Sequence, residues 1–259
     1  MPRSGLSVRE RSLVVTIETK IVAITGAGRG IGRATALHLA ARGARLVLGA
    51  RSEAEIAAVA EEIEAAGGKA IYRATDVTSR ADLEALVNLG CARFGRLDVI
   101  VNNAGIGPIS RFDALRVDDW DKMIDVNLKG ALYGIAASLP VFSRQGRGHV
   151  VNVISTAGIK IVPTMGVYAA TKNALRTATE ALRQESVSGL RVTEVSPGFI
   201  DTSFAETSIT DPETRAVIRK RKEELAISPD AIARAIAFAI EQPDDVEIGS
   251  IVVRPTAQD

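Results

Sequence analysis

The chain has 259 residues, of which 46% are hydrophobic, so it is long enough to bury a sizeable core and too apolar to be mostly disordered. Its 32 lysines and arginines nearly cancel its 31 aspartates and glutamates, and a net charge of +1 gives no field that would attract nucleic acid or an anionic membrane. One cysteine and two histidines exclude an intrachain disulfide and a metal site built from several of these residues, so we expect no metal and a reducing compartment.

The first 18 residues come before the regular pattern of the chain, and we expect them to form a loose extension. They begin with basic residues but lack the long apolar stretch and the small-residue cleavage site of a secretory signal. No apolar run approaches the ~18–20 residues that are needed to span a bilayer. The sequence therefore predicts a soluble, cytoplasmic protein without a membrane partner.

Short β-rich runs alternate with longer helical patterns over residues 19–259. Each expected strand and the helix after it are, in chain order, 20–25 and 31–41, 45–48 and 53–66, 70–74 and 79–94, 97–101 and 120–143, 149–154 and 164–186, and 191–195 and 229–241, with a last strand at 247–253. Strands such as 21–25 are apolar at nearly every residue, which is typical of a parallel sheet covered by helices on both faces. The pattern predicts an α/β fold, a single-domain doubly wound parallel sheet (Rossmann fold) with helices on both faces.

The least regular stretch of this domain is 199–227. It combines a polar segment with basic residues at helical spacing, which extend from Arg215 to Lys222. A solvated helix face would have this composition, and so would a mobile lid over a binding site. We interpret 199–227 as a substrate-binding loop or lid.

Four glycines lie in the turn between the first expected strand and the first expected helix, at positions 26, 28, 30 and 32. Their spacing departs from the strict G-x-G-x-x-G pattern. Glycines nevertheless let a turn approach a pyrophosphate closely, and the N-terminus of the following helix adds a partial positive charge. The turn therefore predicts a nucleotide site that is built from Gly26, Gly28, Arg29, Gly30 and Ile31.

The end of the second expected strand bears on the choice of cofactor. A dinucleotide without a 2′-phosphate usually meets an acidic residue there, whereas this chain has Arg51. An arginine suits a 2′-phosphate, and Arg29 in the glycine turn could join it. We therefore favour NADP(H) over NAD(H). NAD(H) stays possible, because Arg51 could be an ordinary exposed residue and Glu53 could contact a ribose.

Tyr168 and Lys172 lie four residues apart in the helix expected over 164–186. Side chains at this spacing share one helical face, so a protonated lysine would favour ionisation of the phenol. The pair could therefore work as an acid or base. In isolation, the same spacing would also suit a half-buried tyrosine beside a solvated charge.

Further short motifs follow along the chain: Asp76 in DVT, Asn102-Asn103-Ala104-Gly105, Asn127 in VNLKG, Ser155, and Pro197 to Thr202 in PGFIDT. With the glycine turn and the Tyr168 and Lys172 pair, they make residues 20–200 resemble the short-chain dehydrogenase/reductase family. Many members end in a glycine-rich segment with paired glycines, which this chain lacks. Its ending, 246–258, is similar to the branch of NADP-dependent 3-hydroxy acid, serine and clavulanate-type dehydrogenases.

The resemblance implies a catalytic set of Asn127, Ser155, Tyr168 and Lys172. Tyr168 would give a proton to the substrate oxygen in carbonyl reduction and take it back in oxidation. Ser155 would hydrogen-bond that oxygen. Lys172, together with the oxidised nicotinamide, would lower the pKa of Tyr168, and it would hold the nicotinamide ribose. Asn127 would interrupt its helix so that a water can link Lys172 to solvent.

The resemblance also implies cofactor contacts outside the glycine turn. Asp76 and Val77 would contact the adenine, while Asn102 would tie neighbouring strands together. The later loops would line the cofactor path and reach the carboxamide through Asn103, Ala104, Gly105, Pro197, Gly198, Ile200 and Thr202. Thr202 is explained equally well as a helix N-cap.

The function that the resemblance implies is an NADP(H)-dependent oxidoreductase that interconverts an alcohol and a carbonyl, with a small 3-hydroxy acid or semialdehyde as the expected substrate. One alternative is a reductase of larger ketones or 3-oxoacyl compounds. Another is a non-catalytic NADP(H)-binding redox sensor. The expected partners are a small molecule and further copies of the chain, since family members commonly form dimers or tetramers through helices at about 118–145 and 164–187 here.

Overall fold

Seven parallel strands form the centre of the structure, a computed structural model that describes residues 17–186, 189–204, 209 and 211–258. In chain order, the strands are β1 (Ile21–Thr25), β2 (Arg45–Ala50), β3 (Lys69–Ala74), β4 (Val99–Asn102), β5 (Gly148–Val153), β6 (Leu190–Pro197) and β7 (Ser250–Val253). They lie side by side in the order β3-β2-β1-β4-β5-β6-β7. The predicted doubly wound parallel sheet is confirmed.

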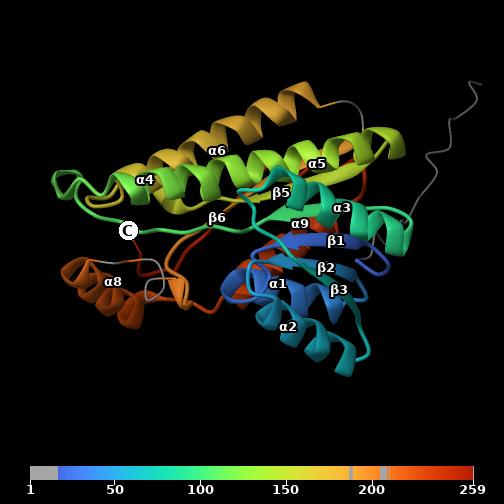
Figure 1. Cartoon of the computed structure of the whole chain (residues 1–259), viewed down its shortest axis with the longest axis horizontal. Helices are drawn as coiled ribbons and strands as arrows, with labels where there is room; N and C mark the ends of the chain where they lie inside the picture. Colours follow the sequence, from blue (N-terminus) through green and yellow to red (C-terminus); the bar gives the residue numbers. More distant parts are fainter. Residues whose placement is uncertain (1–16, 187–188, 205–208, 210, 259) are drawn as a thin grey trace, which may run out of the picture.

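Helices cover both faces of this sheet (Figure 1). One layer holds α1 (Gly30–Ala40), α2 (Glu53–Ala65) and α9 (Asp230–Ile240), and the other holds α3 (Arg80–Phe94), α5 (Gly130–Gln145) and α6 (Gly166–Glu185). The shorter elements are η1 (Phe112–Ala114), α4 (Val117–Met123), η2 (Ile124–Lys129) and η3 (Thr156–Gly158). Another helix, α8 (Pro212–Leu225), stands apart from both layers at the left of Figure 1.

The burial of β1 explains why its sequence is apolar at every position. Val22 and Ile24 belong to the core on the side of α1 and α9, whereas Ile21 and Ala23 belong to the core on the side of α3 and α5. Successive side chains of a strand point to opposite faces, so a strand covered on both sides needs apolar residues throughout.

Local signals set several helix ends. The Ser52 hydroxyl accepts a hydrogen bond from the Glu55 N–H at 3.4 Å at the start of α2, and the Ser79 hydroxyl accepts one from Asp82 N–H at 3.3 Å at the start of α3. Both serines are N-caps, which satisfy a free N–H of the first helical turn. α3 ends at Gly95, whose φ of +84° favours glycine.

Two expected elements differ from the structure. The helix expected over 120–143 is divided into α4 and α5 by η2, a single π-helical segment that contains Asn127. The strand expected over 247–253 pairs with β6 only from Ser250, because the Glu247 carboxylate accepts the Val192 N–H at 2.8 Å before the backbone ladder begins. Residues 1–16 of the expected extension lie outside the described residues, and Ile17 is buried in the core.

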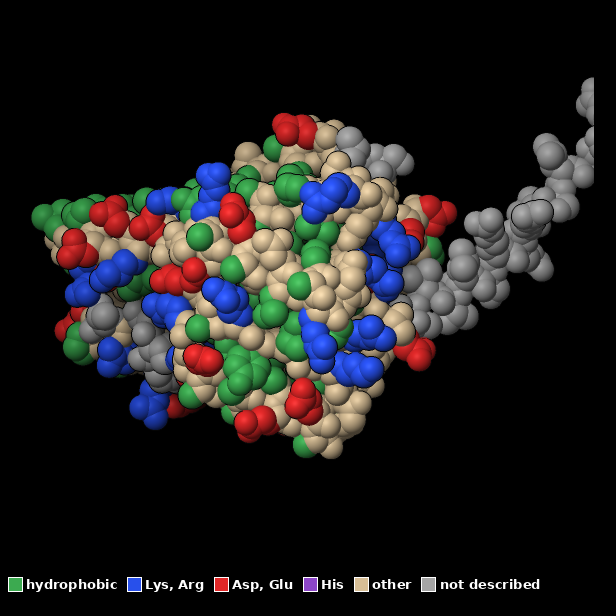
Figure 2. Space-filling model, turned by 45° about the vertical axis from the view of Figure 1, so that its right-hand side comes forward, with side chains coloured by type: hydrophobic (Ala, Val, Ile, Leu, Met, Phe, Trp, Pro, Cys, Tyr) green, Lys and Arg blue, Asp and Glu red, His purple; other side chains and the backbone are tan. Residues whose placement is uncertain are grey.

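Acidic and basic side chains are both scattered over the face that Figure 2 presents, in keeping with a net charge of +1. Over the described parts of the chain, no helix combines the length and the apolar character that crossing a membrane requires.

The strand order places a crevice at the carboxyl ends of the central strands. β1 lies between β2 and β4, so the chain continues outward in opposite directions from the β1/β4 pair. Loops that leave the carboxyl ends of such strands diverge and open a crevice, which is where ligands bind in doubly wound sheets. The glycine turn follows β1 and the Asn103 loop follows β4, so both lie at this crevice.

Candidate active site

A cleft of about 1230 Å³ opens at the carboxyl ends of the strands. It exceeds the ~300–1,000 Å³ that is usual for one small ligand, which leaves room for a dinucleotide with a substrate. Of the residues that the sequence pointed to, Asn127, Asn102 and Glu53 are not among the lining residues. The others line the cleft together: Gly26, Gly28, Arg29, Gly30, Ile31, Arg51, Asp76, Val77, Asn103, Ala104, Gly105, Ser155, Tyr168, Lys172, Pro197, Gly198, Ile200 and Thr202.

The glycine turn has a shape that side chains would prevent. Gly26 and Gly30 have φ values of +65° and +53°, in the left-handed region that favours glycine. A Cβ on Gly32 would lie 2.2 Å from the carbonyl oxygen of Gly26. The turn therefore needs glycine where α1 begins, and its bare backbone fits the pyrophosphate of a dinucleotide.

Hydrogen bonds from β4 hold this turn in place. The Asn103 side-chain amide donates to the carbonyls of Thr25 at 2.9 Å and Gly26 at 3.2 Å. The Thr25 hydroxyl accepts the N–H groups of Asn103 and Ala104, both at 3.1 Å. Thr25 was missed as a site residue, although a threonine between an apolar strand and a glycine turn was the available signal.

Asn102 ties β4 to β5, as expected. Its side-chain amide donates to the Asn152 carbonyl oxygen at 2.9 Å, and the Asn152 amide donates to the Thr179 hydroxyl at 2.8 Å. This buried chain of polar groups connects the sheet to α6, the helix that carries Tyr168 and Lys172.

Two arginines and one glutamate line the cleft near the end of β2. Arg51 is exposed and lines the cleft. Arg29 forms an ion pair with Glu55 at 3.0 Å, and Glu55 also lies against Gly28. Glu55 was missed from the sequence, whereas Glu53, the residue considered for a ribose contact, is not among the lining residues. An adenosine ribose at this end of the cleft would therefore meet both positive and negative side chains.

Asp76 and Val77 follow β3 at the same end of the cleft. One Asp76 carboxylate oxygen accepts both the N–H of Thr78 at 2.9 Å and its hydroxyl at 2.8 Å. Val77 is buried and packs against Gly130, where a Cβ would lie 2.8 Å from a Val77 methyl carbon. Asp76 is thus fixed by contacts within its own turn, and Val77 by packing against the start of α5.

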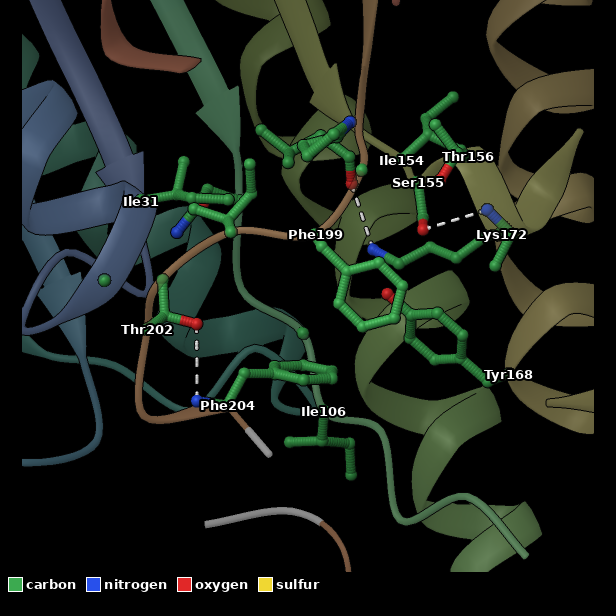
Figure 3. A pocket seen from close by; sticks show the side chains of 18 of the residues that line it. Ile31, Ile106, Ile154, Ser155, Thr156, Tyr168, Lys172, Phe199, Thr202 and Phe204 are labelled. Atoms are coloured by element: carbon green, nitrogen blue, oxygen red, sulfur yellow. Dashed lines mark hydrogen bonds between the residues drawn. The ribbon is translucent and has the colours of Figure 1, made fainter. Parts of the chain in front are cut away.

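Ser155 and Tyr168 come together from different elements (Figure 3). Ser155 follows β5, and its hydroxyl accepts the Ala157 N–H at 3.1 Å. Tyr168 lies in the first turn of α6. Burial raises the pKa of Tyr168, and a hydrogen bond with Ser155 opposes this effect only in part. The phenol is therefore protonated at neutral pH, ready to act as a proton donor.

Lys172 is 4% exposed, and its ammonium donates to the Val153 carbonyl at 3.0 Å. Burial lowers the pKa of Lys172 to about 8. Its Nζ lies 6.0 Å from the centre of the Tyr168 ring. The sequence led us to expect that Lys172, together with the oxidised nicotinamide, lowers the pKa of Tyr168. Among the groups of the chain itself, burial raises this pKa, and the Lys172 ammonium donates to a carbonyl.

Asn127 anchors the loop after β4 from behind the cleft. Its side chain accepts the Ile106 N–H at 2.8 Å and donates to the Ile106 carbonyl at 2.9 Å. It also donates to the Thr171 hydroxyl at 3.2 Å. A Cβ on Gly105 would lie 3.4 Å from both the Asn127 oxygen and the Lys172 ammonium. Asn127 thus lies in the π-helical segment between α4 and α5, and its oxygen and the Lys172 ammonium are equally near the Gly105 Cβ position.

The wall beside Tyr168 is apolar. Buried Ile109 and Ile209 form a small cluster there with Met165, Tyr168 and Ile218. The Phe204 ring adds to it, with its centre 5.9 Å from that of Tyr168 (Figure 3). These side chains come from the loop after β4, the start of α6 and the region of α8, so the expected lid segment contributes to the wall.

The loop after β6 is held by Gln258, which was not predicted. The Gln258 carbonyl oxygen accepts the Phe199 N–H at 2.9 Å, and its amide donates to the Thr156 hydroxyl at 3.4 Å. Gln258 therefore connects this loop to the residue after Ser155. The unusual ending of the sequence was the available signal.

The Thr202 hydroxyl accepts the Phe204 N–H at 3.3 Å, a local contact like that of a helix N-cap.

No group of three or more His, Cys, Asp or Glu residues is placed to hold a metal ion within the described ranges. His149 is buried, with its Nε2 2.8 Å from the Thr193 hydroxyl, and burial lowers its pKa well below the usual value. Burial also raises the pKa of the Cys91 thiol. Neither residue lines the cleft.

Comparison with known proteins agrees with this site. A family model for short chain dehydrogenases matches residues 20–213. An uncharacterized oxidoreductase of Listeria monocytogenes is 45% identical over 247 residues, 94% of this chain and 99% of the relative. The structure of an alcohol dehydrogenase from the archaeon Thermococcus sibiricus, complexed with 5-hydroxy-NADP, has a TM-score of 0.83 at 33% identity, covering 93% of this chain and 99% of that one.

A second solved structure has the same layout. The closed form of a serine dehydrogenase complexed with NADP+ has a TM-score of 0.84 at 27% identity, and the match covers 92% of this chain and 96% of that one. The family match spans more than half of the chain and includes the glycine turn, Ser155, Tyr168 and Lys172. The chain belongs to the short-chain dehydrogenase/reductase family of nicotinamide-dependent oxidoreductases.

Proposed function

We propose that the chain interconverts an alcohol and a carbonyl compound with NADP(H) as cofactor. The observation that carries this proposal is that Ser155 and Tyr168 line one cleft together with buried Lys172, and that this cleft adjoins the glycine turn. The nicotinamide of a bound cofactor supplies or accepts the hydride.

In carbonyl reduction, the Tyr168 phenol gives its proton to the substrate oxygen, and the Ser155 hydroxyl donates a hydrogen bond to the same atom. The raised pKa of Tyr168 keeps this proton in place at neutral pH. In alcohol oxidation the proton returns to the phenolate. Lys172 and the oxidised nicotinamide together would favour the phenolate, because nearby positive charges favour the charged form.

Asn127 and Lys172 supply a route by which the proton is replaced. The Asn127 oxygen and the Lys172 ammonium lie at equal distance from the Gly105 Cβ position, and the Asn127 amide is bound to the loop after β4. A water between Asn127 and Lys172 would connect the ammonium to solvent. This role is that of a positioning residue, since Asn127 does not line the cleft.

The cofactor preference rests on Arg51 and Arg29. Arg51 has no acidic partner among the described residues and follows β2, where a 2′-phosphate would be met. Solved relatives that carry NADP or a derivative of it support the same choice. Glu55 opposes it, because its carboxylate holds Arg29 and would repel a phosphate. We favour NADP(H), with NAD(H) as the alternative.

Two substrate classes fit the same chemistry. A small 3-hydroxy acid or semialdehyde is the first proposal, and it is supported by the likeness to a serine dehydrogenase. A larger ketone or a 3-oxoacyl compound is the second, and the apolar wall around Tyr168 favours it. NADPH absorbance should be followed over 3-oxo acids, semialdehydes, ketones and aldehydes, and the reverse reaction over 3-hydroxy acids.

The test of the chemistry is Tyr168→Phe. We expect it to bind NADPH normally and to lose at least about 100-fold in hydride transfer, because it removes the proton donor. Tyr72→Phe is the matched control, since Tyr72 is exposed on β3 away from the cleft. Retained hydride transfer in Tyr168→Phe would contradict the role of Tyr168. No turnover by the unmodified enzyme on any carbonyl would favour a redox sensor that binds NADP(H).

We further propose that the enzyme is cytoplasmic and acts as a homodimer or homotetramer through the region of α5 and α6. Ile124 of η2 and Leu132 of α5 are 40% and 38% exposed, and apolar side chains on a surface helix are suited to a partner. Light scattering of the purified protein, with Leu132→Glu for comparison, measures the assembly. A monomeric unmodified protein would contradict the proposal.

A further inference from the structure

The cleft is strongly positive, although the chain as a whole has a net charge of only +1. Over the described residues its lining includes three acidic side chains, Glu55, Asp76 and Glu224. It includes seven cationic side chains: Arg29, Arg51, Lys160, Lys172, Arg221, Lys222 and Arg254. An excess of one sign of charge in a cleft concentrates ligands of the other sign, so the excess of cationic side chains here favours anions.

Several of these cations have partners or belong to the adenosine end. Arg29 and Lys222 form ion pairs, with Glu55 and Asp201, and Lys172 donates to a backbone carbonyl. Arg51 follows β2, whose Gly49 carbonyl accepts a hydrogen bond from Ala27 of the glycine turn. Three cations remain that form no ion pair in the part of the chain that the structure describes: Lys160, Arg221 and Arg254.

Of these three, Arg221 lies on α8, which turns one face to the cleft. Ile218, Arg221, Lys222 and Leu225 all line the cleft, at the spacing that places side chains on one helical face. The other bases of the run are engaged elsewhere: Arg215 with the Ile209 carbonyl at 2.7 Å, Arg219 with Glu223 at 3.1 Å and Lys220 with Glu224 at 3.9 Å.

The position of Ile218 shows which end of the cleft Arg221 faces. Ile218 packs in the apolar cluster that contains Tyr168. Arg221 follows one turn later on the same face of α8, so it lies at the catalytic end. A pyrophosphate would lie at the glycine turn. Arg221 is therefore placed for the substrate.

We propose that Arg221 binds a carboxylate of the substrate, so that the enzyme acts on oxo acids and the matching hydroxy acids. The inference rests on the proposed alcohol and carbonyl chemistry. A guanidinium offers paired N–H donors that match a carboxylate. An uncharged substrate would offer the Arg221 guanidinium no charged partner. Lys160 and Arg254 add positive charge from two other segments of the lining.

The test compares acids with their uncharged esters. 3-Oxobutanoate and 4-oxobutanoate, and the methyl ester of each, are supplied with NADPH to the unmodified enzyme, Arg221→Gln and Arg219→Gln. The matched control, Arg219, is exposed on the same helix, pairs with Glu223 and does not line the cleft. We expect Arg221→Gln to lower kcat/KM for the acids by about 10- to 100-fold, mainly through KM, because it removes a charge-assisted hydrogen bond.

The same experiment contains the results that would overturn the proposal. The esters should be affected alike by Arg221→Gln and Arg219→Gln. Equal effects of the two variants on the acids would remove Arg221 from the substrate site. Esters that the unmodified enzyme reduces as well as the acids would show that no carboxylate is recognised, while the oxidoreductase chemistry would stand.

Binding of succinate, measured by calorimetry on the NADP+-loaded protein, gives a readout that does not depend on turnover. Succinate binding that is weakened in Arg221→Gln and unchanged in Arg219→Gln supports the carboxylate site even if no carbonyl is reduced. If succinate binds in this way and no carbonyl is reduced, the proposed alcohol and carbonyl chemistry is contradicted, but the carboxylate site is supported. Failure of the unmodified protein to bind succinate, together with equal turnover of acid and ester, overturns the site.

Discussion

The glycine turn and α8 line the same cleft but are attached to the molecule in different ways. The turn is fixed by Asn103 and Thr25, and α1 packs on it at Gly32. α8 has no buried residue, and ion pairs along its own surface such as Arg219 with Glu223 stabilise it locally. The cofactor end of the cleft therefore belongs to the rigid framework of the sheet and its packed helices. The substrate end includes α8, none of whose residues is buried in this framework.

This difference suggests how one fold serves many substrates. A substitution in the turn disturbs packed backbone and buried hydrogen bonds, and such changes cost about 1–3 kcal/mol or more. A substitution on the exposed face of α8 is expected to change stability by no more than about 0.5 kcal/mol. The sequence of α8 can therefore change with the substrate while the turn keeps the dinucleotide.

The largest effect is expected from Gly32→Ala. The added Cβ would lie 2.2 Å from the Gly26 carbonyl oxygen, so the turn or α1 must shift. We expect a loss of about 3 kcal/mol in the free energy of unfolding and a loss of dinucleotide affinity. Urea unfolding and NADPH fluorescence titration measure the two. Gly249→Ala is the control, because nothing lies within 4 Å of that Cβ position. Similar behaviour of the two variants would mean that the turn is not rigid.

The next largest effect is expected from Lys172, a charged side chain that is buried in this framework. The pKa of Lys172 is lowered from 10.5 to about 8, so between these values the unfolded chain holds a proton that the native protein has released. Unfolding then takes up a proton, and raising the pH stabilises the native state. The Lys172 contribution to the free energy of unfolding should rise by about 3 kcal/mol over this range and be constant below it.

Comparing the unmodified protein with Lys172→Met, by urea unfolding from pH 7 to pH 10.5, isolates this contribution. The unmodified protein should gain stability relative to the variant as the pH rises. Lys220→Met, on the exposed side of α8, should follow the unmodified protein. A difference between unmodified protein and Lys172→Met that does not change with pH would show that the ammonium is solvated.

A smaller effect is expected from substitution of Arg51, an exposed residue that follows β2. Arg51→Asp should weaken NADPH binding by about 10-fold or more and leave NADH binding nearly unchanged, because a charged hydrogen bond to the 2′-phosphate is lost. Arg73→Asp makes the same charge change on exposed β3 away from the cleft. An unchanged ratio of the two affinities would count against the NADP(H) preference.

What could be predicted from the sequence depended on whether the contacts were local. The glycine turn and the Tyr168 and Lys172 pair lie in short stretches, so spacing and motif order were sufficient to bring them together. Thr25 meets Asn103 across 78 residues, and Phe199 meets Gln258 across 59. Glu55 reaches Arg29 from the next helix of the chain. Nothing in the spacing of single residues indicates such pairs, because the packing of the sheet and helices creates them.

The smallest effect is expected at Gln258, which connects the two regions. It binds the loop that leads from β6 toward α8, through Phe199, and the residue after Ser155, through Thr156. Gln258→Ala should lower kcat/KM a few-fold with a change in unfolding free energy of about 1 kcal/mol, because one partly exposed hydrogen-bonding group is lost. Gln258→Glu keeps an acceptor for the Phe199 N–H and should restore most of the activity. If alanine and glutamate at this position act alike, the bond to Phe199 does not position the loop, and the two ends of the cleft are joined through the sheet alone.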